Sequence, residues 1–403
     1  MTSKETSSMG PLAGIRVIDM TRILAGPFCT MNLGDMGAEI IKIEQPGRGD
    51  DTRGWGPPFA GDQAAYFLGV NRNKKSVTLN LKDERAQRLL GDLLRNADII
   101  IENFKPGTLD SWGFSSDWFR SETPQLIHCA ITGYGDTGPK GGMPGYDFLL
   151  QAESGLMSVT GEENGGAQKL GVAIVDVCTG QYAAMCILAA LNARRVNGRG
   201  QRIDLSLFNT SLSMLINVAS NYLVGNDSPA RYGNGHPNIV PYRDFTCSTG
   251  EIALAVGNDM QFQNLSRVLD HPEWAEDERF KKNADRVNNR VACDGAIGAI
   301  LSTNSADHWI DLFQGEGIPC GKINTVEEAL ESEQAKANAM VTEIEHATAG
   351  FIKMLGIPYK FSETSVGINL PPPLLGEHTK EILKSLANLD EGQIKDLSDN
   401  EVI

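Results

Sequence analysis

The sequence predicts an α/β protein with a Rossmann-like large domain, built on a parallel sheet, and a smaller α+β domain. Short β-branched runs alternate with amphipathic stretches over the first third of the chain, which is the pattern of strands joined by crossover helices. Helical patterns dominate from about residue 260 to residue 317. At 403 residues the chain exceeds the usual size of a single hydrophobic core, so two domains are expected.

Five strands are expected in the first third, because each segment is rich in aliphatic and β-branched residues. They are residues 15–20, 38–44, 76–81, 97–104 and 126–135. Helical patterns lie between them, for example at 27–37 and 83–96. Strands separated by helices of this length pair in parallel through right-handed crossovers.

The middle of the chain predicts a long helix and then a change of domain. An apolar run leads to Asp176, which opens a helical pattern that continues to about Val196. Residues 202–225 predict a strand and another helix, and residues 226–242 break the pattern with Gly, Pro and Asn. The second domain is expected to contain a strand at 249–257 and helices at 261–271, 277–301 and 306–317.

Charge and composition exclude several classes of function. A net charge of −15 argues against a general nucleic-acid-binding or anionic-membrane surface, so an anionic ligand needs a local basic pocket. The seven cysteines are scattered without metal-binding spacing, which indicates reduced thiols in an intracellular protein. No long apolar run predicts a membrane span, and the N-terminus lacks a signal-peptide core. A cytoplasmic protein is therefore expected, with the mitochondrial matrix as the alternative for a processed chain.

Known motifs give no support to metal, serine or nucleotide chemistry. None of the six histidines has a His or Cys neighbour at metal-binding spacing, and no GxSxG element occurs. GYGDTG at 133–138 satisfies the dinucleotide fingerprint, but Pro139 and a glycine pair follow where a helix should begin. We expect no metal and no nucleotide cofactor, and interpret this stretch as a tight loop that brings backbone close to a ligand.

Two carboxylates remain as candidates: Asp176, at the expected strand-to-helix junction, and Asp147, at the start of another helical pattern. Either can simply cap its helix; for Asp176 the donors would be the amides of Cys178 or Thr179. The functional interpretation uses the same geometry, because the helix dipole would hold the carboxylate ionised and ready to attack an acyl carbon. Small residues at 171 and 180 are expected to leave room for the substrate.

Ordered blocks along nearly the whole chain carry a resemblance to a known family. They are residues 11–53, 71–77 (NRNKKSV), 102–114 (ENFKPGTLDSWGF), 132–139 (TGYGDTGP), 145–161, 175–180 (VDVCTG), 197–208 and 371–379 (PPPLLGEHT). In these blocks the chain resembles the class III CoA-transferases, the family of formyl-CoA and carnitine CoA-transferases and of the α-methylacyl-CoA racemases.

The resemblance implies an interlocked homodimer of two ring-like protomers, in which the large domain resumes after the small one. The expected ranges are 1–222 for the first part of the large domain, 223–325 for the small domain with its linkers, and 326–403 for the segment that completes the large domain. The implied partners are an acyl-CoA and a small carboxylic acid, with neither nucleic acid nor membrane.

The resemblance also implies the roles of individual residues. Asp176 matches the family nucleophile. The positions matched to coenzyme A binding are Leu79, Lys82, Asn103 and Phe104. Gln45 and Ser111 stand where some members use arginine, so other cations are considered for the CoA phosphates. These substitutes are Lys74, Lys75 and Arg72.

The implied reaction moves CoA from an acyl-CoA, expected to be succinyl-CoA, to a short dicarboxylate such as glutarate, succinate or itaconate. It proceeds through an aspartyl anhydride and an aspartyl-CoA thioester. The second carboxylate of the acceptor needs a partner when it is desolvated, and Arg22 and Arg53 are predicted to bind it. The other candidate substrate residues are Tyr146, Asp147, His236 and Arg243.

Two alternatives stay open at this point. An α-methylacyl-CoA racemase resembles the chain but carries histidine in a GHD block, where this sequence has Tyr146, and tyrosine is a poor proton carrier at neutral pH. A non-catalytic CoA-binding protein would keep the pocket without the exchange reaction.

Overall fold

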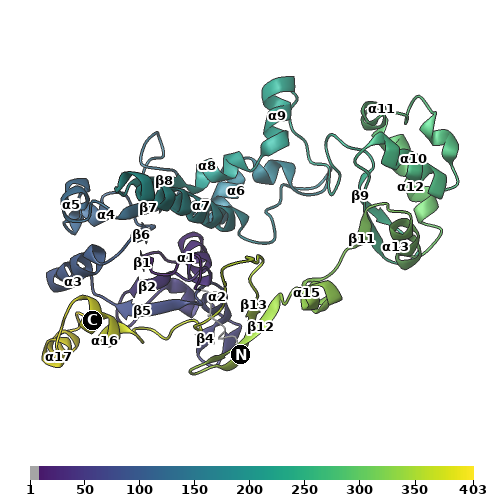
Figure 1. The fold of residues 1–403 in the computed structure, drawn as a ribbon. Coiled ribbons are helices and arrows are strands. Elements are labelled where there is room, and N and C mark those ends of the chain that lie inside the picture. Colours follow the sequence, from purple (N-terminus) through teal and green to yellow (C-terminus); the bar gives the residue numbers. More distant parts are fainter. Residues whose placement is uncertain (1–8) are drawn as a thin grey trace. The chain divides into compact units, whose positions relative to one another are not determined.

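The computed structural model describes residues 9–403, which divide into two compact units by their contacts (Figure 1). Of the described residues, the large unit contains 9–154, 171–214 and 333–403, and the small unit contains 155–170 and 215–332. These boundaries, at 214/215 and 332/333, differ from the expected 222/223 and 325/326.

Residues 155–170, which were expected in the large domain, are bound to the small unit by backbone and arginine hydrogen bonds. The Gly233 N–H donates to the Gly161 carbonyl at 3.2 Å. The Arg231 guanidinium donates to the carbonyls of Ser158 at 3.2 Å and Gly165 at 2.8 Å. These contacts between distant parts of the chain explain why the segment leaves the large unit.

Six parallel strands form the centre of the large unit, in the order β5-β2-β1-β6-β7-β8. They are β1 (Arg16–Asp19), β2 (Glu39–Glu44), β5 (Lys74–Thr78), β6 (Ile99–Glu102), β7 (Ile127–Thr132) and β8 (Arg202–Ser206). The predicted parallel sheet is confirmed. Because every pairing is parallel, the carboxyl ends of all six strands lie at one edge, where ligands bind in open α/β sheets.

Amphipathic helices connect these strands. α3 (Glu84–Arg95) is typical: Leu89, Leu90, Leu93 and Leu94 are buried on one face, and the Asp83 carboxylate accepts from the Arg85 N–H at its start. The other helices of the large unit before residue 215 are α1 (Ala25–Asp35), α2 (Ala65–Val70), α4 (Thr108–Ser111), α5 (Ser116–Glu122), α6 (Asp147–Glu153), α7 (Ile174–Asn197) and α8 (Leu207–Ser213). Short elements are η1 (Asp51–Gly54), β3 (Phe59–Ala60) and β4 (Gln63–Ala64).

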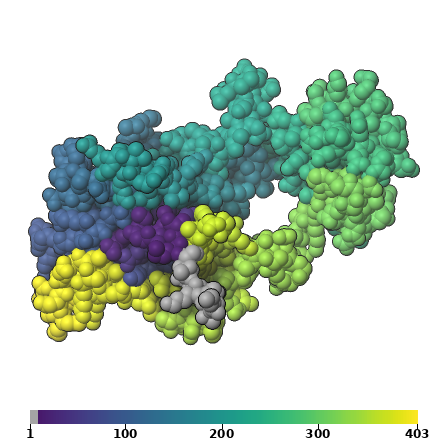
Figure 2. Space-filling view, viewed as in Figure 1, coloured from purple at the N-terminus to yellow at the C-terminus, as the bar shows by residue number. Residues whose placement is uncertain are grey.

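The segment after residue 332 completes the large unit. Its elements are α15 (Glu333–Ala337), β12 (Val341–His346), β13 (Gly350–Leu355), α16 (Thr379–Leu386) and α17 (Glu391–Asp399). The Thr78 N–H donates to the Thr379 hydroxyl at 3.0 Å, and the Asn80 N–H donates to the Val402 carbonyl at 2.8 Å. In both views this yellow C-terminal segment lies against the purple and blue N-terminal strands (Figures 1 and 2).

The small unit packs helices on a three-stranded sheet, with its own core around Phe262, Phe313 and Trp309. Its strands are β9 (Tyr242–Thr246), β10 (Glu251–Ala255) and β11 (Cys320–Lys322). Its helices are η2 (Leu156–Val159), α9 (Ile216–Gly225), α10 (Asp259–Val268), η3 (Pro272–Ala275), α11 (Asn283–Asn288), α12 (Arg290–Leu301), α13 (Ala306–Gly315) and α14 (Val326–Glu331). The predicted helix at 277–301 is divided into α11 and α12.

Within residues 9–403, α7 is the one helix whose length and composition would allow it to cross a membrane, although the sequence analysis found no such run. Buried helices in the core of folded domains can have the same length and apolar composition. α7 packs closely on α1, since a Cβ added at Gly180 would lie 2.5 Å from the Ala25 carbonyl oxygen. This packing is typical of a core helix.

Candidate active site

Asp176 is the third residue of α7, and the side chain that caps this helix is Asp147. The Asp147 Oδ2 atom accepts from the backbone N–H groups of Val175 at 2.7 Å and Asp176 at 3.3 Å. Its Oδ1 atom accepts from Gln151. The element directly before α7 is η2, so the predicted strand-to-helix junction was wrong, and so was the alternative that Asp176 caps its own helix.

The electrostatic setting of Asp176 favours the protonated form. Burial, followed by the negative charge of Asp147, raises the pKa of Asp176 from 3.8 to about 7. The sequence analysis expected the helix dipole to keep this carboxylate ionised, and the structure shows the opposite direction. The favourable N–H groups at the start of α7 are already bound by Asp147, so they do not stabilise the Asp176 anion directly.

An aromatic pair lies within electrostatic reach of the two carboxylates. Burial raises the pKa of Tyr66 in α2, and the charges of Asp176 and Asp147 raise it further. The Tyr66 ring meets the Trp55 ring edge to face, with centroids 5.2 Å apart. This pair was not predicted from the sequence, because Trp55 and Tyr66 lie between two of the blocks that resemble the family, at 11–53 and 71–77.

The two glycines that were expected to leave room for the substrate, Gly171 and Gly180, have different surroundings. Gly180 does not leave room for a substrate, because α1 occupies the space beside it. Gly171 is open, with no heavy atom within 4 Å of an added Cβ. In the glycine-rich stretch, no helix follows GYGDTG until α6 begins at Asp147, so the dinucleotide fingerprint has no pyrophosphate-binding helix.

A cavity of 180 Å³ lies at the carboxyl edge of the sheet, and we call it the edge cavity. Its lining residues are Met20, Arg22, Lys42, Ile43, Glu44, Gln45, Arg48, Gly49, Asp50, Leu79, Asn80, Leu81, Lys82, Phe104 and Trp112. Three of the four residues matched to CoA binding are therefore brought together. The fourth, Asn103, holds the adjacent turn: its side chain accepts from the Arg22 N–H at 3.1 Å and donates to the Arg22 carbonyl at 2.9 Å.

The three cations considered for the CoA phosphates do not line this cavity. Lys74 is completely buried and pairs with Asp19 at 3.2 Å. Arg72 is buried against Asp35 at 2.7 Å, and Lys75 pairs with Glu39 and Glu381. The sequence predicted these three cations as phosphate ligands, whereas Arg72 and Lys74 are buried in the interior at the start of β5.

The predicted dicarboxylate-binding arginines have protein partners. Arg53 donates two hydrogen bonds to Glu44, at 2.7 and 2.8 Å, one to the Pro373 carbonyl at 3.1 Å, and stacks on Phe67. Arg22 pairs with Asp51 at 2.9 Å and lines the edge cavity. The pKa of Asp176 responds to burial and to Asp147.

The remaining predicted residues lie in different places. Tyr146 precedes α6 and is exposed. His236 belongs to the small unit, where its Nδ1 atom accepts from the Asn238 N–H at 3.0 Å. Burial and the charge of Arg290 lower the pKa of His236. Arg243, in the same unit, lies 3.8 Å from Asp294.

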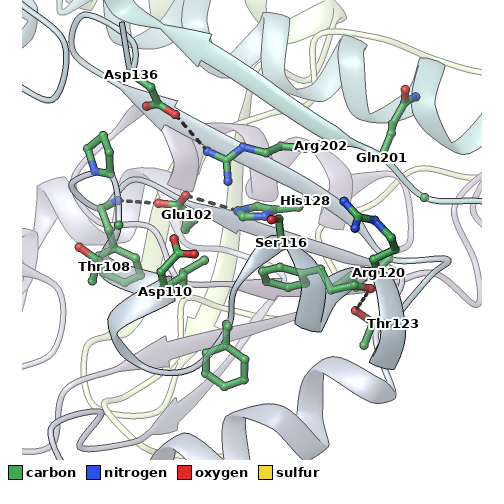
Figure 3. Close-up of a pocket in the computed structure, with 18 of the residues that line it drawn as sticks. Glu102, Thr108, Asp110, Ser116, Arg120, Thr123, His128, Asp136, Gln201 and Arg202 are labelled. Atoms are coloured by element: carbon green, nitrogen blue, oxygen red, sulfur yellow. Dashed lines mark hydrogen bonds and ion pairs between the residues drawn. The ribbon is translucent and has the colours of Figure 1, made fainter.

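A larger cavity of 790 Å³ lies over β6, β7 and β8 of the large unit (Figure 3). At its floor the Glu102 and His128 side chains face each other at 3.4 Å, and Arg202 approaches Asp136 at 3.5 Å. Its lining contains neither Asp176 nor Asp147. Within residues 9–403 no group of three or more His, Cys, Asp or Glu side chains is placed to hold a metal ion.

The parallel sheet has a cavity lined by basic residues at its carboxyl edge, and the large unit also holds a half-buried carboxylate of raised pKa. This combination is typical of an α/β enzyme that acts on activated acyl groups. The chain belongs to CoA-transferase family III, whose family model matches residues 12–379, and it is a CoA-transferase.

Relatives and solved structures agree with this assignment. Succinyl-CoA:glutarate CoA-transferase of Mus musculus is 42% identical over 98% of this chain and 90% of its own length. Succinate–glutarate CoA-transferase of Agrobacterium fabrum is 40% identical over 94% of this chain and 96% of its own length. A CAIB/BAIF family protein from Brucella suis has a TM-score of 0.82 and 41% identity, covering 94% of this chain and 100% of that one.

Proposed function

We propose that this enzyme transfers CoA from succinyl-CoA to a short dicarboxylate, with glutarate or itaconate as the acceptor and Asp176 as the covalent carrier. The observation that carries the mechanism is the placement of Asp176 in the first turn of α7, with a pKa near 7 and a second carboxylate behind it. The names of several relatives support a dicarboxylate, because glutarate, oxalate, mesaconate and citramalate each carry two carboxyl groups.

The first half-reaction charges Asp176 with CoA. Its carboxylate oxygen attacks the thioester carbon of succinyl-CoA, so a C–O bond forms, the C–S bond breaks and CoA thiolate leaves. The thiolate then attacks the aspartyl carbonyl of the mixed anhydride, which releases succinate and forms an aspartyl-CoA thioester. The raised pKa makes the ionised Asp176 a stronger nucleophile than an ordinary carboxylate.

The second half-reaction repeats these steps in reverse order with the acceptor. A glutarate carboxylate attacks the aspartyl thioester and expels the thiolate, which then attacks the glutaryl carbonyl and frees Asp176. Each intermediate keeps the acyl group activated, so no ATP is consumed. The anhydrides hydrolyse in water, so the working site must be covered.

A homodimer would supply such a cover, and we propose the interlocked form. Large apolar side chains are exposed near Asp176 in the large unit, at a level unusual for a free surface. They include Tyr146 at 62%, Phe148 at 61% and Val172 at 60% exposure. Tyr146 and His236 remain the candidate partners for the second carboxylate of the acceptor, because Arg53 is occupied by Glu44.

The racemase and the non-catalytic CoA-binding protein remain distinguishable alternatives. A racemase exchanges the α-proton of its substrate and forms no covalent intermediate, and a binding protein forms no product. Incubation with succinyl-CoA and hydroxylamine should convert Asp176 to a hydroxamate, located by mass spectrometry. Modification of another carboxylate alone would reassign the nucleophile, and deuterium incorporation without exchange would identify a racemase.

The acceptor is tested by exchange from succinyl-CoA to glutarate, itaconate and butyrate at equal concentration, with the product CoA esters separated by chromatography. Glutarate and itaconate should be faster than butyrate by roughly 10-fold or more, since a site built for a second carboxylate is left unpaired by butyrate. Faster transfer to butyrate or acetate would contradict the dicarboxylate assignment.

A further inference from the structure

We propose that the cavity of 790 Å³ over β6, β7 and β8, which we call the sheet-face cavity, is a second ligand site of this enzyme. Its ligand is an anion of mononucleotide size, with a planar ring joined to a phosphate. The sheet-face cavity belongs to the large unit, and neither Asp176 nor Asp147 lines it. We therefore assign it an effector and not a substrate of the CoA transfer.

The connection between β6 and β7 leaves this face of the sheet open. It is made by α4, of four residues, and α5, of seven, whereas the connection between β5 and β6 contains the 12-residue helix α3. Two short helices cover less of a sheet than one long crossover helix does. The volume that remains lies within the range of roughly 300–1,000 Å³ in which small-molecule sites fall.

The rim of the sheet-face cavity carries a surplus of positive charge. The exposed charged residues of its lining are four cations and two carboxylates: Lys105, Arg120, Arg199, Arg202, Asp110 and Asp136. Within residues 9–403, neither Lys105 nor Arg199 forms an ion pair. Arg202 approaches Asp136 at 3.5 Å, a long contact that a phosphate oxygen can replace. On a chain of net charge −15, this rim is a local site for an anion.

The floor of the sheet-face cavity holds buried polar atoms in fixed positions (Figure 3). Glu102 and His128 are 7% and 5% exposed, and the Glu102 Oε1 atom lies 3.4 Å from the His128 Nε2 atom. The Phe119 ring packs on the His128 ring with centroids 4.9 Å apart. A planar ring against this aromatic wall can direct its polar edge to Glu102 and His128 while its phosphate reaches the arginines of the rim.

The turn after β6 joins the sheet-face cavity to the edge cavity. Phe104 lines both cavities, and its N–H donates to the Glu102 Oε2 atom at 2.7 Å. A ligand on Glu102 and CoA in the edge cavity would therefore contact the same turn, and each is expected to change the affinity for the other by the same factor. This coupling rests on the CoA-transferase function, whereas binding in the sheet-face cavity does not.

Calorimetric titration with AMP tests the second site, with saturating CoA present so that the edge cavity is filled. Adenosine and ribose 5-phosphate, which each keep one half of AMP, should bind at least about 10-fold more weakly than AMP. Arg199→Gln and Arg202→Gln should each weaken AMP binding by roughly 10- to 100-fold, the range expected for lost hydrogen bonds to a charged group. Arg195→Gln changes an exposed arginine outside the lining, so it is the matched control and should bind AMP like the wild type.

The dissociation constant of AMP at rising CoA concentration separates two sites from one. With two coupled sites it should change by about 5-fold or more and then become constant, and a value independent of CoA would refute the coupling. A continuous rise would mean that AMP and CoA share one site and would overturn the inference.

Two further results would overturn the second site. One is the absence of AMP binding to the wild type, and the other is unchanged AMP affinity in both Arg199→Gln and Arg202→Gln, with folding verified by thermal melting. An enzyme that binds AMP in this way but transfers no CoA would refute the proposed function and leave the second site intact.

Discussion

Asp176 must lose a proton before it can attack an acyl carbon, and its surroundings make that loss harder. With a pKa of about 7, close to half of the free enzyme carries a protonated Asp176 at neutral pH. We expect kcat/KM for succinyl-CoA to rise with pH along a limb with an apparent pKa near 7. A flat profile between pH 5 and 8, measured with a stable wild-type enzyme, would contradict this role.

The same shift has a consequence for stability. The folded pKa lies above the ordinary value of 3.8, so the contribution of Asp176 to stability is present below about pH 3.8 and is lost as pH rises to about 7. Asp176→Asn removes the buried charge and should stabilise the protein by roughly 1–3 kcal/mol at pH 8 but little at pH 4. Urea unfolding at the two pH values measures the difference; equal effects at both would exclude it.

Asp147 is both a helix cap and a neighbour of the candidate nucleophile, but the helix that it caps is α7 and not α6, the helix that it begins. It caps α7 through Val175 and Asp176, and its charge raises the pKa of Asp176. Asp147→Asn keeps an oxygen acceptor but removes the charge, so the rising limb of kcat/KM should move to lower pH. Glu153→Gln, which removes a carboxylate at the end of α6, is the control and should leave the limb in place.

At the scale of elements, the turn between β1 and α1 is held in an unusual conformation. Ile23 has a φ of +74°, which a β-branched residue rarely adopts. The turn is held by side chains on both sides: Lys42 donates to the Thr21 carbonyl at 2.8 Å, and Asp50 accepts from the Ile23 N–H at 3.2 Å. Such strain persists only where the surroundings fix it.

The buried Lys42–Asp50 pair should therefore be sensitive to single changes. Asp50→Asn leaves the Lys42 ammonium buried without its counter-ion and is expected to cost about 3–5 kcal/mol. The double variant Lys42→Met with Asp50→Asn should be clearly more stable than Asp50→Asn alone. Denaturant unfolding of the variants decides this, and a double variant with the full sum of the single losses would rule out an ion pair.

The sequence predicted the helices and strands better than it predicted which side chains pair with each other. Parallel strands, α3 and the end of α7 near Val196 follow from local patterns, and Gly198 closes α7 in the left-handed conformation. The cap of α7 could not be predicted, because its donor and acceptor lie 28 residues apart in sequence. Lys74 was misjudged for the same reason, because its partner Asp19 lies 55 positions earlier, in β1. Arg53 was misjudged because its partner Glu44 belongs to another element, β2.

At the scale of the whole molecule, the exposed apolar surface near Asp176 predicts self-association. Light scattering should give about twice the mass of one chain, and Phe148→Glu should shift it toward a single chain, because a buried charge is costly at an interface. Phe351→Glu, on β13, changes another exposed phenylalanine and serves as the control. A wild-type protein with the mass of one chain would contradict the proposed homodimer.

The large unit is assembled from three separated stretches of chain, and this sets an order for its synthesis. Thr78 pairs with Thr379 across 301 positions, and Asn80 pairs with Val402. A chain still emerging from the ribosome therefore holds β5 without its closing helices until residues 379–402 have been synthesised. The stretch 215–332 is contiguous and leaves the ribosome earlier, so most of the small unit can fold while the large unit is still incomplete.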